Sequence, residues 1–402
     1  MDLEKLFNVE DTFATATRVK KKRLKRLRGP DSPLCTTLYP MICMMRIFGL
    51  APYGYCEDRL VPYNYYLSFS LISASLYTYI IYVVYVRFNG LTRDKPLLGS
   101  TETVKVVREA VFSNYFVALF DIIHTITYRQ RFVRIWNILQ DFDENVRQLG
   151  YPGSEKNTKI WAWAIVAFHT LIWTLVNRMG MYAFGEKWIY NFSYMLIYLA
   201  TFVSVYKFVG MVLLLGQRFK HLNSIAERNI PPRIVDNEAA SILGIKTIEN
   251  LHNDLMIAGE ELALLYSWCL IFWLGNLSIH TVSNIFFIID WLMPQAWENV
   301  TWSLIFCLNI WLVAFVSQLI ALNFSCDYAS TAANAIRPIM MEWQLQLSRH
   351  NKDISPKTTL HFINRTLQFS AAGCFSVDLP LLRSIAALLS TYLVILLQFP
   401  AQ

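Results

Sequence analysis

Seven long apolar runs dominate this chain of 402 residues and restrict what it can fold into. They cover residues 64–86, 106–127, 160–180, 189–214, 264–290, 301–324 and 379–399. A helix needs about 20 mostly apolar residues to cross the hydrocarbon core of a bilayer, and each run is about that long. Only 16% of the residues are charged, against about 25% in a typical soluble protein. The sequence therefore predicts an all-α membrane protein with seven transmembrane helices.

The distribution of Lys and Arg predicts how these spans are oriented. The N-terminal segment 1–63 and the loops after spans two, four and six contain 27 of the 36 Lys and Arg residues. The loops after spans one, three and five contain 7. Cytoplasmic loops carry the excess of positive charge, so we expect a cytoplasmic N-terminus and an extracellular C-terminus. This orientation is the reverse of that of a G-protein-coupled receptor.

Two N-glycosylation sequons fall on the predicted outer side. Asn191 is followed by Phe and Ser, and Asn299 is followed by Val and Thr, which is the acceptor pattern. Both lie close to the ends of predicted spans. They are the glycosylation candidates of this chain.

The spacing of Cys and His indicates no metal centre, cofactor or catalytic site. The 7 Cys residues form no CxxC pair, and the 7 His residues show no HExxH or similar ligand spacing. A transporter is expected to show internal repeats with spans broken by Gly or Pro, and none is found. We therefore expect neither an enzyme nor a bound cofactor.

Some helices are expected to extend beyond the membrane. The stretch 236–290 contains no proline, and its first half has a helical stripe of apolar residues at Ile242, Ile245, Ile248, Leu251, Leu255 and Leu262. Such a helix would be about 80 Å long, far more than a bilayer requires. Residues 354–369 show a weaker stripe. We expect these cytoplasmic extensions to pack against each other and against neighbouring subunits; the alternative is an ordinary loop with one short helix.

The N-terminal part of the chain is predicted to touch the membrane without crossing it. Eight of the eleven residues 18–28 are Lys or Arg, which is typical of a disordered tail that contacts anionic lipid headgroups. Seven spans make nucleic acid an unlikely partner for such a tail. The apolar stretch 38–52 is too short to span and is expected to lie at the interface or to re-enter the membrane.

The last run has the two faces of a pore-lining helix. Thr391, Val394, Ile395 and Gln398 share a face with small residues, whereas the opposite face is bulky and aliphatic and includes Leu393. Val394 and Ile395 could form a hydrophobic gate, and a ring of Gln398 amides could contact hydrated cations. Periodicity alone leaves an alternative open, in which the hydroxyls bond backbone carbonyls and Gln398 lies at the interface.

Three segments resemble the insect gustatory receptors, which are related to the insect odorant receptors. The segment 391–399, Thr-Tyr followed by five hydrophobic residues and Gln-Phe, fits their C-terminal pattern. The segment 372–378 resembles the small-residue, Gly, Phe and Asp pattern that precedes their last helix, and 47–52 looks like their Gly-hydrophobic-Pro stretch.

This resemblance implies a tastant-gated, nonselective cation channel that conducts Na, K and Ca without a G protein. It would be a homo- or hetero-tetramer with other gustatory receptors, in the plasma membrane of gustatory neuron dendrites. Gln398 and Phe399 would lie where the pore is narrowest, and Thr391 and Tyr392 match the family's Thr-Tyr pair. The implied organisation is a basic tail (1–37), a six-helix ligand-binding bundle (38–324), cytoplasmic anchor helices (325–378), and a pore helix with a short extracellular tail (379–402).

The resemblance also places the ligand pocket among the outer halves of the first six spans. Aromatic faces with a few amides suit small organic ligands, although any one of these residues could instead serve helix packing. The candidates there are Tyr79, Tyr82, Asn114, Trp173, Asn177, Tyr194, Tyr198, Asn276, His280, Asn284 and Trp302.

The residue after the motif tyrosine bears on the ligand class. Within the family that this chain resembles, the sugar receptors are alike in having Glu at that position, whereas this chain has Leu393. We therefore expect bitter or other non-sugar compounds, with a fructose-type or thermosensory receptor as the alternative. A G-protein-coupled chemoreceptor is disfavoured, because its Glu/Asp-Arg-Tyr and Asn-Pro-x-x-Tyr motifs are missing and the charge bias has the opposite sign.

Overall fold

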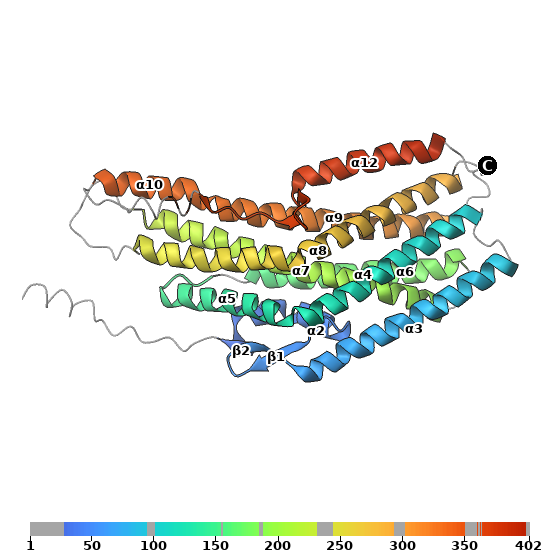
Figure 1. Ribbon diagram of the computed structural model, residues 1–402, viewed down its shortest axis with the longest axis horizontal. Helices are drawn as coiled ribbons and strands as arrows, with labels where there is room; N and C mark the ends of the chain where they lie inside the picture. Colours follow the sequence, from blue (N-terminus) through green and yellow to red (C-terminus); the bar gives the residue numbers. More distant parts are fainter. Residues whose placement is uncertain are drawn as a thin grey trace, which may run out of the picture.

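Long helices lie side by side along one axis of the molecule, with two short β-hairpins between them (Figure 1). The computed structural model describes residues 28–94, 101–153, 156–184, 188–230, 244–292, 302–349, 360, 362 and 364–398. The helices are η1 (Gly29–Asp31), α2 (Pro33–Ile47), α3 (Asn64–Asp94), α4 (Thr101–Thr127), α5 (Arg129–Gln148), α6 (Lys156–Phe184), α7 (Trp188–Arg228), α8 (Ile245–Leu292), α9 (Trp302–Asn334), α10 (Ile336–Arg349) and α12 (Leu379–Gln398). The strands are β1 (Tyr53–Cys56), β2 (Arg59–Pro62), β3 (Ser370–Ala371) and β4 (Phe375–Ser376).

The predicted membrane spans all fall on helices. Within the described part of the chain, six helices are long and apolar enough to cross a membrane, namely α3, α4, α6, α7, α8 and α9. The seventh predicted span coincides with α12, whose apolar part is shorter. The all-α membrane fold predicted from the sequence is therefore confirmed.

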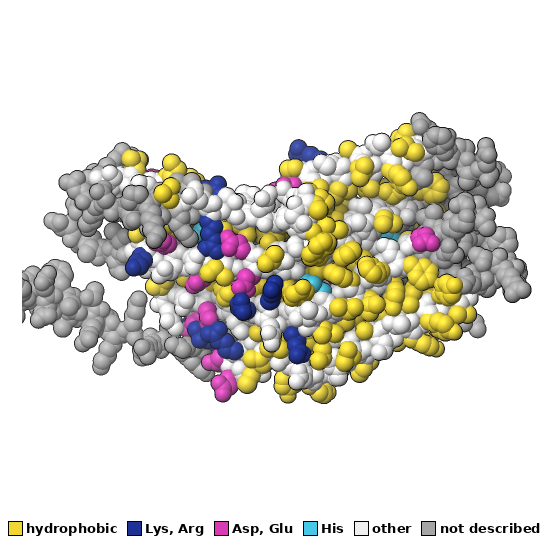
Figure 2. Space-filling view, viewed as in Figure 1, with side chains coloured by type: hydrophobic (Ala, Val, Ile, Leu, Met, Phe, Trp, Pro, Cys, Tyr) yellow, Lys and Arg dark blue, Asp and Glu magenta, His cyan; other side chains and the backbone are white. Residues whose placement is uncertain are grey.

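The molecule has an apolar half, which contains α3, α4 and α12, and a charged half, which contains α5 and α10. Figure 2 shows hydrophobic side chains over the first and gathered Lys, Arg, Asp and Glu side chains over the second. Charged groups are costly in hydrocarbon, so the apolar half is the part that suits a bilayer. The ion pairs of the charged half include Arg28–Asp141, Arg59–Asp141, Arg134–Glu261, Arg147–Glu144, Arg218–Asp143 and Arg365–Glu260.

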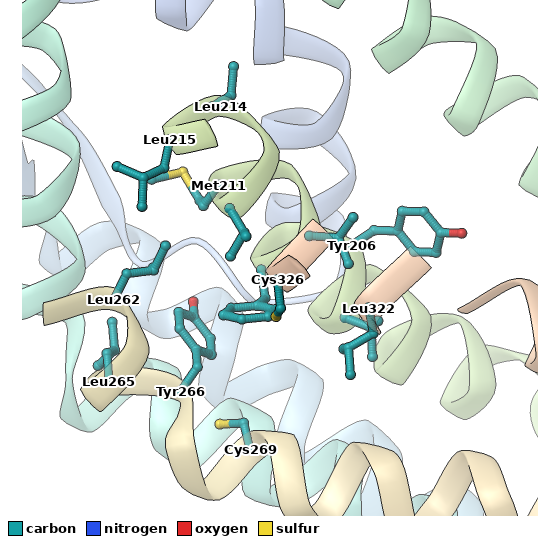
Figure 3. Packing of buried hydrophobic residues seen from close by; sticks show 14 of the residues in the cluster. Tyr206, Met211, Leu214, Leu215, Leu262, Leu265, Tyr266, Cys269, Leu322 and Cys326 are labelled. Atoms are coloured by element: carbon teal, nitrogen blue, oxygen red, sulfur yellow. The ribbon is translucent and has the colours of Figure 1, made fainter. Parts of the chain in front are cut away.

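The long helix predicted around the fifth span is present as α8. It has 48 residues and is thus roughly 72 Å long, more than twice the thickness of a bilayer core. It begins at Ile245, and the residues before Gly244 that were expected to belong to it lie outside the described part. Its stripe is buried as expected at Ile248, Leu255 and Leu262. Figure 3 shows the next part of α8, from Leu262 to Cys269, facing side chains of α7 and α9. The alternative of a loop with one short helix is wrong.

An additional helix, α5, follows the second span, where only a loop was expected. The chain leaves helical geometry for one residue at Tyr128 and then continues for 20 residues. One face of α5 buries Phe132, Ile135, Trp136 and Leu139. That face packs against α8 and β2, so α5 belongs to the core of the charged half.

The apolar stretch 38–52 forms most of α2 and the turn after it. α2 has 15 residues, is capped by Ser32, and packs against α6 and α7 rather than crossing the bundle. The turn needs glycine, because Gly49 has φ +71° and an added Cβ would lie 2.7 Å from Ser73 Oγ. The Ser70 hydroxyl donates to the Gly49 carbonyl and fixes the turn on α3.

A short connector fastens the start of α12 to the long helices. Arg365 forms two hydrogen bonds of 2.7 Å with the Glu260 carboxylate of α8, and the Asn334 amide pairs with the backbone N–H and C=O of Leu367 at 3.2 Å each. The Ala372 N–H donates to the Ser267 carbonyl at 3.0 Å. Residues 360, 362 and 364 are helical, as expected, whereas 365–369 form neither helix nor strand, so the helix expected over 354–369 is wrong there. Residues 354–359, 361 and 363 lie outside the described residues.

The connector ends in a hairpin that turns the chain into α12. Gly373 has φ +74° and sits in the tight turn between β3 and β4, which explains the glycine of the segment 372–378. Asp378 then caps α12, because its Oδ1 accepts a hydrogen bond from the Leu381 N–H at 2.9 Å.

Replacing Asp378 with Ala should weaken the start of α12. An N-cap of this kind contributes about 0.5 to 2 kcal/mol, so we expect Asp378→Ala to lower the thermal unfolding temperature of the purified receptor in detergent. Asp378→Asn keeps an oxygen acceptor, so its unfolding temperature should be close to that of the original protein. Equal unfolding temperatures for the Ala variant and the original protein would show that the cap contributes nothing.

Candidate ligand-binding site and pore helix

A cluster of five aromatic rings lies between α6, α7, α8 and α9. Its members are Trp173, Tyr198, His280, Trp311 and Phe315. His280 stacks on Phe315 with 4.6 Å between ring centroids, and Tyr198 lies edge-on to Trp311 at 4.8 Å. Trp173 stacks on Tyr198 at 6.0 Å. The four helices thus present a shared apolar, π-rich surface inside the bundle.

Two polar atoms of this cluster, and a third one helical turn away on α6, are buried without a partner. Trp173 Nε1, Asn177 Oδ1 and His280 Nε2 make no hydrogen bond among the described residues. Trp173 and Asn177 are four residues apart and share one face of α6. A buried polar atom without a partner costs about 1–3 kcal/mol, so native proteins rarely keep several together. A small molecule with an acceptor for the indole N–H and a donor for the amide oxygen would satisfy this arrangement.

The other predicted amides make hydrogen bonds within the bundle, although Asn114 Nδ2 is also buried without a partner among the described residues. The Asn276 Nδ2 donates to Asn114 Oδ1 at 2.9 Å, and the Ser113 hydroxyl donates to Asn276 Oδ1 at 3.2 Å. This pair ties α4 to α8. The Asn284 Nδ2 donates to the backbone carbonyl of His280, one turn earlier on α8. These three amides therefore serve helix packing.

Three candidates are not brought to the cluster. Tyr79, Tyr82 and Trp302 are 65%, 63% and 62% exposed and lie on the outside of the bundle. The placement of the Tyr194 side chain lies outside the described part. The predicted set of ligand-binding residues therefore combines side chains that point into the bundle with side chains that point out of it. The apolar sequence of each span did not show which face of its helix points inward.

Two members of the cluster were missed from the sequence. Trp311 and Phe315 come from the sixth span and are four residues apart, so they share a face of α9. That spacing was a usable signal, because an aromatic pair on one face of a span often faces its neighbours. Trp302, chosen instead, lies at the first turn of α9.

The glycosylation candidates differ in their placement. Asn191 is buried in α7, and its Nδ2 donates to the backbone carbonyl of Asn177 at 2.6 Å. A buried nitrogen that is already hydrogen-bonded does not suit modification, so Asn191 does not fit this role in the folded chain. Asn299 lies outside the described residues.

The last helix, α12, lies at the edge of the bundle and packs on α8 and α9 (Figure 1). Leu389 and Leu393 are partly buried on its inner side, whereas Thr391, Val394 and Ile395 are exposed. Tyr392 is also exposed. The Ser390 and Thr391 hydroxyls donate to carbonyls one turn back, at 2.8 and 3.0 Å. The side chain of Gln398 and all of Phe399 lie outside the described part.

A buried polar cluster at the centre of the bundle was not predicted. The Lys207 ammonium of α7 donates to the Leu50 carbonyl at 3.0 Å and lies 4.5 Å from the centroid of the Phe132 ring. The Asp121 carboxylate of α4 accepts from Trp273 Nε1 of α8 at 3.1 and 3.0 Å. These contacts join α4, α5, α7, α8 and the turn after α2.

Comparison with known proteins identifies the family. The model of the 7tm chemosensory receptors matches residues 38–402, which is most of the chain. The chain belongs to this family, whose members are multi-pass membrane receptors rather than enzymes. The resemblance drawn from the terminal motif is thereby confirmed at the level of the family.

Individual relatives agree with this assignment. Over 89 residues the chain is 37% identical to the gustatory and pheromone receptor 32a of Drosophila melanogaster, and this match covers 22% of this chain and 19% of that protein. The insect olfactory receptor OR5 from Machilis hrabei has a similar fold, with a TM-score of 0.67 over 91% of this chain and 98% of that chain, at 14% identity. Its complex with eugenol matches with a TM-score of 0.66 and 14% identity, over 90% and 97% of the two chains.

Proposed function

We propose that this chain is a subunit of a tastant-gated, nonselective cation channel in the plasma membrane of gustatory receptor neurons. The observation that carries this proposal is the half-covered α12. Its aliphatic face rests on α8 and α9, while a face with Ser384, Thr391 and Val394 remains exposed. The hydroxyl groups donate to the helix backbone, and their oxygen lone pairs stay available to water or to a cation.

Several copies of α12 would be needed to surround a pore. One chain presents only one such helix, at its edge, so the pore must form between subunits. In the charged half, α10 exposes Met341 and Leu345 on one face while burying Met340 and Trp343. Apolar groups exposed to water mark contact surfaces, and a second copy of the chain would cover them. A tetramer places four α12 helices around one axis, with Val394 and Ile395 as the hydrophobic gate and Gln398 near the mouth.

The aromatic cluster suits a lipophilic ligand that is not a sugar. A sugar carries many hydroxyl groups, and each would need a polar partner in the site. The cluster offers three unpartnered polar atoms among aromatic walls. A bitter-type organic compound with an apolar body and one or two polar groups fits better, in agreement with Leu393 after the motif tyrosine.

The charged half is proposed to lie in the cytoplasm, with the C-terminus outside. The excess of Lys and Arg in the N-terminal segment and in the loops after spans two, four and six supports this orientation. We expect an epitope at the C-terminus to be labelled by antibody on intact cells, and one at the N-terminus only after permeabilisation. The opposite labelling pattern would contradict the orientation.

The channel activity can be tested on the purified receptor in planar bilayers, where no G protein is present. We expect a tastant from a bitter and non-sugar panel to open cation currents, and a fructose response would support the alternative ligand class. Gln398→Ala should change the permeability ratio of Ca²⁺ to Na⁺, because it removes an amide from the pore mouth. The control is Leu389→Ala, a half-buried position on the opposite, inner side of α12 that packs on α8 and α9. Currents whose permeation is the same in both variants would contradict the assignment of the pore.

The ligand site can be tested by removing one donor. Trp173→Phe keeps an aromatic ring but loses the indole N–H, so we expect the half-maximal ligand concentration to rise about two- to tenfold, the effect of one hydrogen bond. Trp163→Phe makes the same change at an exposed position of the same helix and should leave that concentration unchanged. Equal half-maximal ligand concentrations for Trp173→Phe and Trp163→Phe would show that Trp173 does not contact the ligand.

A further inference from the structure

A cavity lies between α2, α6 and α7, next to the aromatic cluster, and none of the five rings of that cluster lines it. Met41 and Met44 of α2 form one wall, His169 and Thr170 of α6 another, and Leu199 and Phe202 of α7 the third. The open space of about 390 Å³ includes space outside the protein, so this is a partly open pocket rather than an enclosed chamber. Apart from His169 and Thr170, the walls named here are apolar.

His169 is the polar feature of this cavity. The side chain is only 3% exposed and lies against the adjoining rings of Phe202 and Tyr206, at centroid distances of 4.2 and 4.6 Å. Its Nδ1 lies 2.9 Å from the Ile165 carbonyl oxygen. A carbonyl oxygen can only accept a hydrogen bond, so Nδ1 carries the proton and donates.

The tautomer of His169 determines which kind of hydrogen-bond partner its Nε2 atom requires. A buried imidazolium without a nearby anion is costly, so the ring is neutral and Nε2 carries a lone pair. Nε2 is buried and has no hydrogen-bond partner among the described residues. It is therefore an unsatisfied acceptor at the wall of an apolar cavity, and its partner must be a donor.

We propose that this cavity binds an apolar molecule carrying a hydroxyl group that donates to His169 Nε2. Ethers, esters and ketones offer only hydrogen-bond acceptors, and hydrocarbons offer neither donors nor acceptors, so these classes do not fit. An alcohol or phenol is the donor class that we propose. Such a molecule can come from the bilayer, as a sterol, or from outside, as a lipophilic alcohol. The bound molecule would fill the space between α2 and the pair of helices α6 and α7. Its binding would not require the channel to open.

The test uses photolabelling of the purified receptor in nanodiscs. The probes are a diazirine-bearing long-chain alcohol and its methyl ether, and the labelled peptides are mapped by mass spectrometry. We expect the alcohol to label residues 165–170 and 199–206 about fivefold more than the ether, the effect of one hydrogen bond of ordinary strength. Equal labelling by the two probes would overturn the proposal.

Variants of two residues sharpen this test. His169→Phe keeps the ring but loses Nε2 and should reduce alcohol labelling to the level of the ether. His169→Asn retains an acceptor oxygen, and its amide can donate to the carbonyl one turn back as Asn284 does, so it should keep the preference for the alcohol. Unchanged labelling of His169→Phe would contradict the proposal.

The mouth of the cavity offers a matched pair on the surface of α6. Thr170 lines the cavity and Thr174 does not, yet both are exposed and both donate to the carbonyl one turn back. Thr170→Trp should block labelling, whereas Thr174→Trp should not. Labelling that survives Thr170→Trp would place the probe elsewhere and overturn the proposal.

A competition separates the two sources of the hydroxyl compound. If added sterol displaces the alcohol from residues 165–170, the natural occupant is a membrane lipid. If sterol has no effect and short-chain terpene alcohols displace the probe, the occupant comes from outside. Both results require the same hydroxyl-selective site. Neither is measured through ion currents, so the labelling experiment can fail or succeed independently of the proposed channel function.

Discussion

The structure depends on one helix that is apolar on all sides and must be surrounded. In its most apolar window α7 is 83% buried, and α2, α3, α4, α6, α8, α9 and α10 all contact it. A helix of this kind cannot face water, so its neighbours are required rather than optional. The single cation at its centre, Lys207, is accommodated because the Leu50 carbonyl and the Phe132 ring satisfy its charge. That contact also holds the turn after α2 in the bundle.

The candidate ligand site and the candidate pore are joined by α8. His280 belongs to the aromatic cluster, Ser267 accepts the hydrogen bond of the connector hairpin, and Glu260 pairs with Arg365. These three residues lie on one uninterrupted helix. Since the connector is bonded to α8 and α9 and Asp378 caps α12, a displacement of α8 at the cluster would also displace the start of α12.

Much of this arrangement was accessible from the sequence, and the exceptions have physical reasons. Apolar runs and the stripe of α8 predicted the spans, because burial in lipid or in a core imposes a strong pattern. α5 was missed, since Arg and Asp residues alternate with Phe132, Trp136 and Leu139 and direct attention to the charge. Tyr79 and Tyr82 were misplaced because the rotation of α3 depends on its neighbours. Trp173, Tyr198 and His280 come together because each of the three side chains is buried on the inward face of its helix.

The proposed hydroxyl site and the aromatic cluster adjoin on α6 but present different unpartnered atoms. His169 and Trp173 are four residues apart on one face of that helix, yet Nε2 of the first needs a donor and Nε1 of the second needs an acceptor. A ketone or an ether can satisfy Trp173 but has nothing to offer His169. An alcohol can satisfy either, since its oxygen both donates and accepts. Since Asn177 Oδ1 near the aromatic cluster also lacks a donor, we expect a compound with a hydroxyl group to suit both places better than a ketone or an ether does.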